Sequence, residues 1–145
     1  MTRIVVINGP NLNLLGTREP ALYGAATLGD IERMLVVRAA DLHVTVSFVQ
    51  SNHEGELVDA VQGLRGKADG AIVNLGAYTH TSLALRDAFL AVPIPFVEVH
   101  LSNLFKREDQ RHHSMTADLA LGMVTGFGAQ GYVLALEALV GALKA

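Results

Sequence analysis

The sequence contains no cysteine and has no excess of basic side chains, with 11 lysines and arginines against 14 aspartates and glutamates. Without cysteine, disulfides, thiolate nucleophiles and thiolate-bound metals are excluded. A net charge of −3 argues against a nucleic-acid surface, which needs a basic stripe. No apolar run approaches the roughly 18 residues that span a bilayer, and no signal-like segment precedes the first apolar run. We therefore expect a soluble, cytoplasmic protein with no nucleic-acid or membrane partner.

Half of the residues are hydrophobic, which suits one folded domain covering residues 1–145. Apolar runs alternate with helical patterns, and the expected strands are 4–7, 44–49, 70–74, 95–99 and a weaker 122–125. Both faces of these runs are apolar, as in parallel strands covered on both sides. Helices of about 12 to 15 residues are expected between them, and a closing helix over 129–143. The pattern predicts an α/β fold, a flavodoxin-like three-layer sandwich with a five-stranded parallel sheet.

Polar side chains mark the expected helix starts and one irregular segment. Thr27-Leu28-Gly29-Asp30 resembles a capping box, and Ser51-Asn52-His53-Glu54 has the same pattern. Thr79 or Thr81 is expected to cap the helix that follows the third strand. Segment 101–118 is polar and irregular, with at most one short helix expected.

Most of the unusual polar residues lie where the expected strands end. They are Asn8 and Asn11 after the first strand, Asn74 and His80 after the third, and Glu98 and His100 at the fourth. Ligands of open α/β sheets bind at the carboxyl ends of the strands, so these residues predict one site. A long loop, 8–24, also follows the first strand, and long loops are usually functional.

Each of these residues also has an ordinary structural interpretation. Asn8 and Asn11 flank a Gly-Pro turn, and asparagine forms turns readily. Glu98 and His100 share one strand face, where a buried pair can be structural. A carboxylate that fixes the imidazole tautomer is equally how a general acid is held in place. Asp87 lies seven residues after His80, which predicts one shared helix face, although a solvated aspartate is the alternative.

The remaining loop residues of interest also have an ordinary structural interpretation. Arg107 and Arg111 fit surface charge in a polar segment, and Arg18 and Tyr23 fit loop decoration.

Familiar cofactor and nucleophile motifs are absent or incomplete. Gly126-Phe127-Gly128-Ala129-Gln130-Gly131 matches G-x-G-x-x-G, but no second strand with a ribose-binding acid follows it. There is no phosphate-binding G-x-x-x-x-G-K-[ST] loop and no G-x-S-x-G nucleophile elbow. The adjacent His112-His113 pair is poorly spaced for chelation on either a helix or a strand. We expect neither a metal nor a cofactor.

Several blocks of the sequence, taken in order over essentially the whole chain, resemble one enzyme family. The matching blocks are Asn8-Gly9-Pro10-Asn11-Leu12-Asn13-Leu14-Leu15-Gly16, Arg18 to Tyr23-Gly24, Ser51-Asn52-His53-Glu54-Gly55-Glu56-Leu57, Ala77-Tyr78-Thr79-His80-Thr81-Ser82, Arg86-Asp87-Ala88, Glu98-Val99-His100-Leu101-Ser102-Asn103, Arg111-His112-His113-Ser114 and Gly128-Ala129-Gln130-Gly131-Tyr132. In this arrangement the chain resembles the type II 3-dehydroquinate dehydratases.

The resemblance implies a flavodoxin-like hydro-lyase that uses neither cofactor nor metal. It implies conversion of 3-dehydroquinate to 3-dehydroshikimate, with loss of water through an enolate. The family's reaction serves aromatic amino acid biosynthesis by the shikimate pathway, or quinate catabolism. The resemblance also implies a homododecamer, a tetramer of trimers.

The resemblance also implies roles for individual residues. Tyr23 would remove the proton alpha to the ketone, and Arg18 would activate it. His100 would protonate the departing hydroxyl, oriented by Glu98, and Asn11 would hold a water that stabilises the enolate. The matching substrate-binding positions are Asn74, His80, Asp87, Leu101, Ser102 and Arg111.

The chemistry of these residue types agrees with the implied roles. A tyrosine normally has a pKa of about 10, too high for an efficient base at neutral pH. A cation roughly 4 Å away is worth about 4 kcal/mol at an effective dielectric of 20, enough in principle to activate a tyrosine. An arginine–tyrosine loop would then act as a lid that assembles the base and expels water.

Three residues depart from the family pattern, and two other functions stay open. Leu75 stands where proline is usual, which bears on Asn74, and Gln110 and Met115 replace frequent aromatics beside Arg111. A non-catalytic flavodoxin-like module for FMN or a nucleotide is the main alternative. A catalytically inactive relative kept as a scaffold is the other.

Overall fold

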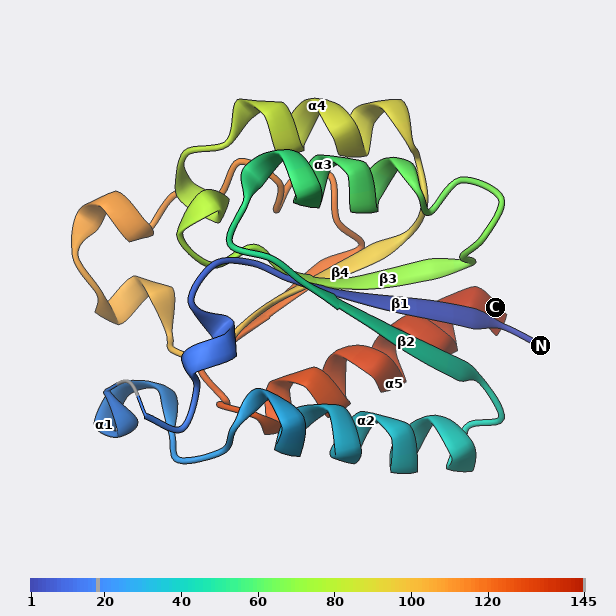
Figure 1. Ribbon diagram of the computed structural model, residues 1–145, viewed down its shortest axis with the longest axis horizontal. Helices are drawn as coiled ribbons and strands as arrows, with labels where there is room; N and C mark the ends of the chain where they lie inside the picture. The colour runs from blue at the N-terminus through green and yellow to red at the C-terminus, as the bar shows by residue number, and fades with distance from the viewer. Residues whose placement is uncertain (18, 145) are drawn as a thin grey trace.

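Five parallel strands form the central layer of the computed structural model, which describes residues 1–17 and 19–144 (Figure 1). The strands are β1 (Arg3–Asn8), β2 (Thr45–Gln50), β3 (Gly70–Asn74), β4 (Phe96–His100) and β5 (Gly122–Thr125). They lie in the order β2-β1-β3-β4-β5, the flavodoxin-like order. The predicted fold class and all five predicted strands are confirmed.

Helices cover both faces of this sheet, with α3 and α4 on one face and α2 and α5 on the other (Figure 1). The helices are α1 (Pro20–Tyr23), α2 (Leu28–Asp41), α3 (Glu54–Gln62), α4 (Leu83–Ala91) and α5 (Gln130–Lys144). Short 3-10 helices occupy Leu12–Leu14, Gly76–His80, Leu104–Lys106 and Asp109–Arg111. Segment 101–118 thus holds two short helical turns rather than one.

Two of the predicted helices are shorter than expected, with nine residues each in α3 and α4. Helix α3 ends at Gln62, and its C-cap is Gly63, a residue with low helix propensity. Helix α4 ends at Ala91, and its C-cap Val92 leaves the helical conformation, with a φ of −124° and a ψ of 85°, before Pro93. Local chain breakers therefore overrode the apolar pattern.

The helix caps agree with the prediction only for α2. Thr27 and Asp30 form the complete capping box there. Ser51 does not cap α3, since its hydroxyl donates to Glu56 and the helix begins at Glu54. Helix α4 is capped by Ser82, not by Thr79 or Thr81, because the 3-10 helix after β3 delays its start.

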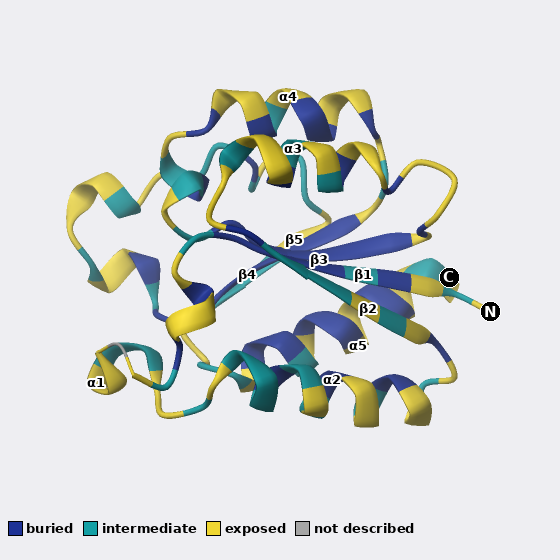
Figure 2. Cartoon of the chain, viewed as in Figure 1, coloured by how far each residue is buried: buried dark blue, intermediate teal, exposed yellow. Residues whose placement is uncertain are grey.

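Two apolar clusters fill the space between the sheet and its helix layers (Figure 2). One includes Ile4, Val6 and Leu136, and the other includes Ile7 and Leu85. Strands β3 and β4 are buried throughout, whereas every residue of the edge strands β2 and β5 is at least partly exposed. The expectation of full cover was therefore wrong for the edges, where the helix layers leave the outer strands partly open.

The parallel register brings the carboxyl ends of β1, β3 and β4 to one edge of the sheet. Helix α1 and the short turns after β1 and β4 also lie at this edge (Figure 1). None of the described helices is both long and apolar enough to cross a membrane.

Candidate active site

A cavity of about 120 Å³ lies at the carboxyl edge of the sheet. Eight of the predicted site residues line it: Asn11, Tyr23, Asn74, His80, His100, Leu101, Ser102 and Arg111. Glu98 lies behind His100 and is bonded to it. The predicted role of Arg18 falls outside the described residues. The carboxyl ends of three strands thus meet at one cavity, where an open α/β sheet binds its ligands.

The turn that carries Asn11 is set by a close approach of two chain segments. The backbone of Gly9 lies against Leu75, and a Cβ at Gly9 would be only 2.3 Å from the Leu75 carbonyl oxygen. Asn11 has a φ of 68°, a left-handed conformation that asparagine tolerates, and its N–H donates to the Asn52 side chain at 3.0 Å. Only glycine at position 9 permits the close approach to Leu75, which holds the loop after β1 against the end of β3.

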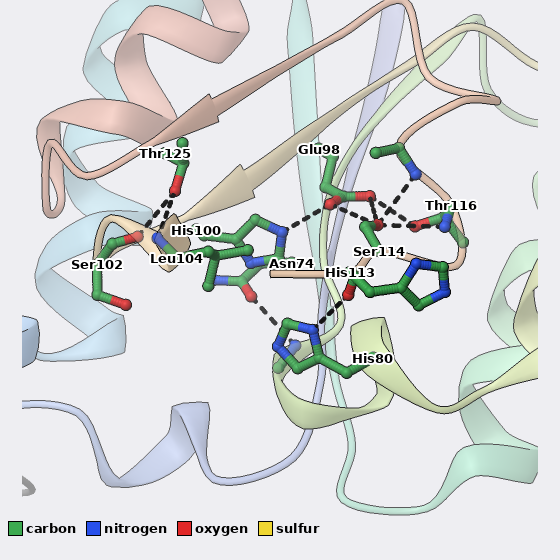
Figure 3. Close-up of polar contacts among 12 residues, drawn as sticks. Asn74, His80, Glu98, His100, Ser102, Leu104, His113, Ser114, Thr116 and Thr125 are labelled. Carbon is green, nitrogen blue, oxygen red and sulfur yellow. Dashed lines mark hydrogen bonds and ion pairs between the residues drawn. The ribbon is translucent and has the colours of Figure 1, made fainter. Parts of the chain in front are cut away.

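Glu98 and His100 form the buried core of the site (Figure 3). His100 Nε2 lies 2.7 Å from Glu98 Oε2, and their side chains are 5% and 1% exposed. The hydroxyls of Ser114 and Thr116 also donate to Glu98, at 2.9 and 2.6 Å. This confirms the predicted shared strand face, and it adds two donors from a distant loop.

Burial by itself raises the pKa of Glu98, but the hydrogen bonds from His100, Thr116 and Ser114 and the charge of His100 outweigh it. The net pKa of Glu98 is therefore below its usual range, and the side chain is a carboxylate that can only accept hydrogen bonds. His100 Nε2 must then carry a hydrogen, because it lies against a carboxylate oxygen that can only accept.

The depressed pKa of Glu98 predicts a loss of stability in acid. Below the ordinary glutamate pKa of about 4.3, the unfolded chain takes up a proton that folded Glu98 still lacks. The stabilisation is complete above that pH and is lost as pH falls through the lower folded-state pKa. Glu98→Gln should therefore show a shallower pH dependence of its free energy of unfolding, measured with urea at several acidic pH values. Glu54→Gln, on α3, is the control and should keep the pH dependence of wild type. If the free energy of unfolding of Glu98→Gln falls as steeply with pH as that of wild type, the prediction is contradicted.

His80 presents a hydrogen-bond acceptor to the same cavity. Its Nδ1 lies 2.7 Å from the His113 carbonyl oxygen, which only accepts, so Nδ1 carries the hydrogen (Figure 3). Burial lowers the pKa of His80, and the nearby positive charges of His100 and Arg111 add to this effect. The hydrogen bond to His113 and the charge of Glu98 oppose it. The net pKa of His80 is below its usual value, so the ring is neutral and carries a lone pair on Nε2 that can accept from a ligand hydroxyl.

Arg107 is a site residue that the sequence reasoning missed, since it was interpreted only as surface charge. Its guanidinium lies 5.5 Å from the centre of the Tyr23 ring and donates to the Ser102 hydroxyl at 3.1 Å. Its side chain is 12% exposed, and it lines the cavity. In the sequence, its spacing of four residues from Arg111 was the feature that could have suggested a shared role in the site. The short turns around 104–111 direct both arginines into the cavity.

Asp87 is not brought into the cavity of its own chain. It is exposed on α4, whereas His80 lies in the preceding 3-10 helix. The predicted shared helix face was wrong because the two residues belong to different helices. A separation of seven residues places two side chains on one face only within a continuous helix, and here a turn intervenes.

The three departures from the family pattern leave the cavity intact. Leu75 is buried in an apolar cluster, and its φ of −82° is near the range that proline favours. Gln110 is exposed, and the backbone N–H of Met115 donates to the Thr79 carbonyl at 2.8 Å. Asn74 and Arg111 accordingly remain among the residues that line the cavity.

The glycine-rich segment before α5 supports the site through its backbone. Gly126 N–H donates to the His100 carbonyl at 3.2 Å, and Gly128 N–H donates to the Leu101 carbonyl at 2.9 Å. The match to G-x-G-x-x-G thus has a structural explanation. Across residues 1–17 and 19–144, no group of three or more histidine, aspartate or glutamate side chains is arranged to hold a metal ion.

Comparisons with known proteins agree on one family. The family model of the class II dehydroquinases matches residues 2–140. A 3-dehydroquinate dehydratase of Prochlorococcus marinus is 56% identical over 141 residues, 97% of each chain. A catabolic 3-dehydroquinase of Aspergillus oryzae is 54% identical over 134 residues, 92% of this chain and 88% of the other. The crystal structure of a type II dehydroquinase from Propionibacterium acnes superposes with a TM-score of 0.93, at 34% identity and with 97% of each chain covered. The chain therefore belongs to the class II dehydroquinase family.

Proposed function

We propose that this chain is a 3-dehydroquinate dehydratase that removes water from 3-dehydroquinate to give 3-dehydroshikimate. The observation that carries the proposal is a tyrosine and a carboxylate-bound histidine in one cavity, Tyr23 and His100. An elimination of this kind needs one group to remove a carbon-bound proton and another to protonate the departing hydroxyl. General acids and bases typically contribute roughly 10²- to 10⁴-fold each.

In the first step, the oxygen of Tyr23 takes the proton alpha to the ketone. The electrons of the broken C–H bond move into the carbonyl group and form an enolate. Asn11, whose turn is fixed at the cavity wall, holds a water against the enolate oxygen. Arg18 keeps the activating role that the family resemblance implies for it.

In the second step, the enolate collapses and the bond from carbon to the departing hydroxyl breaks. The proton on His100 Nδ1 passes to that hydroxyl, which leaves as water. Glu98 accepts from Nε2 throughout, so it orients the ring and stabilises the imidazolium form before transfer. Ser114 and Thr116 keep this carboxylate bonded on its other sides.

The remaining cavity residues suit the polar groups of the substrate. The Ser102 hydroxyl accepts from Arg107, so its own hydrogen is available for the substrate carboxylate, together with the backbone N–H of Leu101. Asn74, His80 and Arg111 lie on the cavity wall and face the substrate hydroxyls in this proposal. Asp87 keeps a substrate-binding role only by resemblance.

Replacing Arg107 should weaken substrate binding, because its charge is close to Ser102 and Tyr23. A hydrogen bond to a charged group is worth about 1.5 to 3 kcal/mol, so Arg107→Ala should raise KM roughly 10- to 100-fold. Steady-state kinetics with 3-dehydroquinate measure this. Lys106→Ala removes an exposed neighbouring charge and should leave KM unchanged. An unaltered KM in Arg107→Ala would remove Arg107 from the site.

The proposed reaction is tested by mixing the protein with 3-dehydroquinate and EDTA, and following ultraviolet absorbance as the conjugated enone forms. Turnover that survives borohydride treatment in the presence of substrate establishes a dehydratase that needs neither metal nor Schiff base. No turnover from folded protein would contradict the proposal. A yellow protein with bound flavin would instead favour the FMN-binding module, which Pro10 after β1 disfavours by removing a backbone N–H.

We also propose the homododecamer that the family resemblance implies, and a cytoplasmic location. Exposed apolar side chains at Val36, Val37 and Phe127 support assembly, since they leave apolar surface to cover. Light scattering distinguishes a dodecamer from a monomer. Relatives named 3-dehydroquinate dehydratase and catabolic 3-dehydroquinase both match the chain, so the comparisons agree with either pathway.

A further inference from the structure

Tyr132 is a buried titratable residue that the proposed mechanism does not use. It lies near the start of α5 and is completely inaccessible to solvent. Its hydroxyl donates to Asn8 Oδ1 at 2.6 Å and accepts from Asn74 Nδ2 at 3.0 Å. A single hydroxyl thus joins the last residues of β1 and β3 to helix α5.

The position of this bridge follows from the sheet register. Asn8 and Asn74 are paired residues at the carboxyl ends of β1 and β3. Side chains at paired positions of neighbouring strands point to the same face of the sheet. On this face α5 packs against β3 and β4, which brings Tyr132 between the two amides.

The directions of the hydrogen bonds leave the Asn74 amide one orientation. Burial raises the pKa of Tyr132, so the hydroxyl stays neutral with a single hydrogen to donate. That hydrogen goes to Asn8 Oδ1, and the hydroxyl oxygen accepts from Asn74 Nδ2. Asn74 Oδ1 in turn accepts from the Gly76 N–H at 3.1 Å. If the Asn74 amide were flipped, its NH₂ group would face the Gly76 N–H, donor against donor. Its carbonyl oxygen would face the Tyr132 oxygen, whose only hydrogen is already donated to Asn8.

We propose that Tyr132 is a positioning residue for substrate binding, which fixes the Asn74 amide so that its remaining N–H and lone pair serve a substrate hydroxyl. Of the two side chains bonded to the Tyr132 hydroxyl, Asn74 lines the cavity and Asn8 does not, so the hydroxyl acts on the substrate through Asn74. The inference rests on the proposed function, because it assigns Asn74 to substrate binding.

Tyr132→Phe tests this by removing one oxygen atom and leaving the ring. We expect KM for 3-dehydroquinate to rise about tenfold, with kcat within about twofold of wild type, as expected when an interaction made equally in ground and transition states is lost. Tyr78→Phe is the matched control, because the Tyr78 hydroxyl donates to the Asn52 carbonyl at 2.9 Å and lies outside the cavity lining. This control should keep both constants.

The double variant separates positioning from general loosening of the fold. In an Asn74→Ala background, Tyr132→Phe should have no further effect on kcat/KM, since its only route to the substrate is gone. An unchanged KM in the single variant, or an equal effect in both backgrounds, would overturn the proposal. If Tyr132→Phe does not fold, Asn8→Ala removes the hydroxyl's acceptor instead and should raise KM in the same way. An inactive wild type would reject the proposed function itself, which is a different outcome.

Discussion

His100→Ala is expected to lower kcat by roughly 10²- to 10⁴-fold, because the departing hydroxyl loses its proton donor. The hydroxyl would have to leave as hydroxide or take its proton from water. KM should change little, since the imidazole acts on the group that leaves rather than on the groups that anchor the substrate. Steady-state kinetics by enone absorbance measure both constants.

The fold should survive this substitution. Glu98 keeps its hydrogen bonds from Ser114 and Thr116, so the carboxylate is not left alone in the core. A circular dichroism spectrum like that of wild type would verify this. His53→Ala, an exposed histidine at the start of α3, is the matched control and should retain full turnover. Full activity in His100→Ala would remove His100 from the role of acid.

Tyr23→Phe should likewise reduce kcat by roughly 10²- to 10⁴-fold, because only the oxygen that removes the alpha proton is lost. In the wild type the Arg107 guanidinium lies 5.5 Å from the centre of the Tyr23 ring. The phenyl ring of the variant can occupy the same place, so the wall of the cavity is retained. The loss should therefore appear in kcat with little change in KM.

Solvent exchange gives a second measurement of the Tyr23 role. An enzyme with a functioning base exchanges the alpha proton of 3-dehydroquinate with deuterium from D₂O whenever the enolate returns to substrate or product is converted back. His100→Ala should retain such exchange, and Tyr23→Phe should lack it. Exchange in Tyr23→Phe at the wild-type rate would assign the base to another residue, and Tyr78→Phe serves as the control for loss of a tyrosine hydroxyl.

Much of the architecture was predictable from local sequence. Short β-branched runs at regular spacing indicated all five strands, because parallel strands covered by helices must be apolar over their central residues. The Glu98–His100 pair was predictable as well, since side chains two residues apart in a strand lie on the same face. The family resemblance was carried by the order of its sequence blocks, and it named eight of the residues that line the cavity.

Other local predictions failed where the chain turned between elements. The sequence placed a cap at Thr79 or Thr81 and a shared face for His80 and Asp87, both of which assumed one continuous helix. A 3-10 helix over Gly76–His80 separates them, and Ser82 caps α4 instead. Periodicity describes a regular element, so it carries no information across an irregular turn.

The sequence by itself determined the order of the strands and helices, the family and the pairing of Glu98 with His100. Each depends on neighbouring residues or on the order of residues along the chain. Only the tertiary structure decided which distant groups support the site: Arg107 on Ser102, Ser114 and Thr116 on Glu98, and Tyr132 between Asn8 and Asn74. These hydrogen bonds form because the packing of the sheet, its turns and α5 buries polar groups that must find partners. Tyr132 and Asn8 are 124 residues apart, a distance over which no local pattern in the chain can indicate contact.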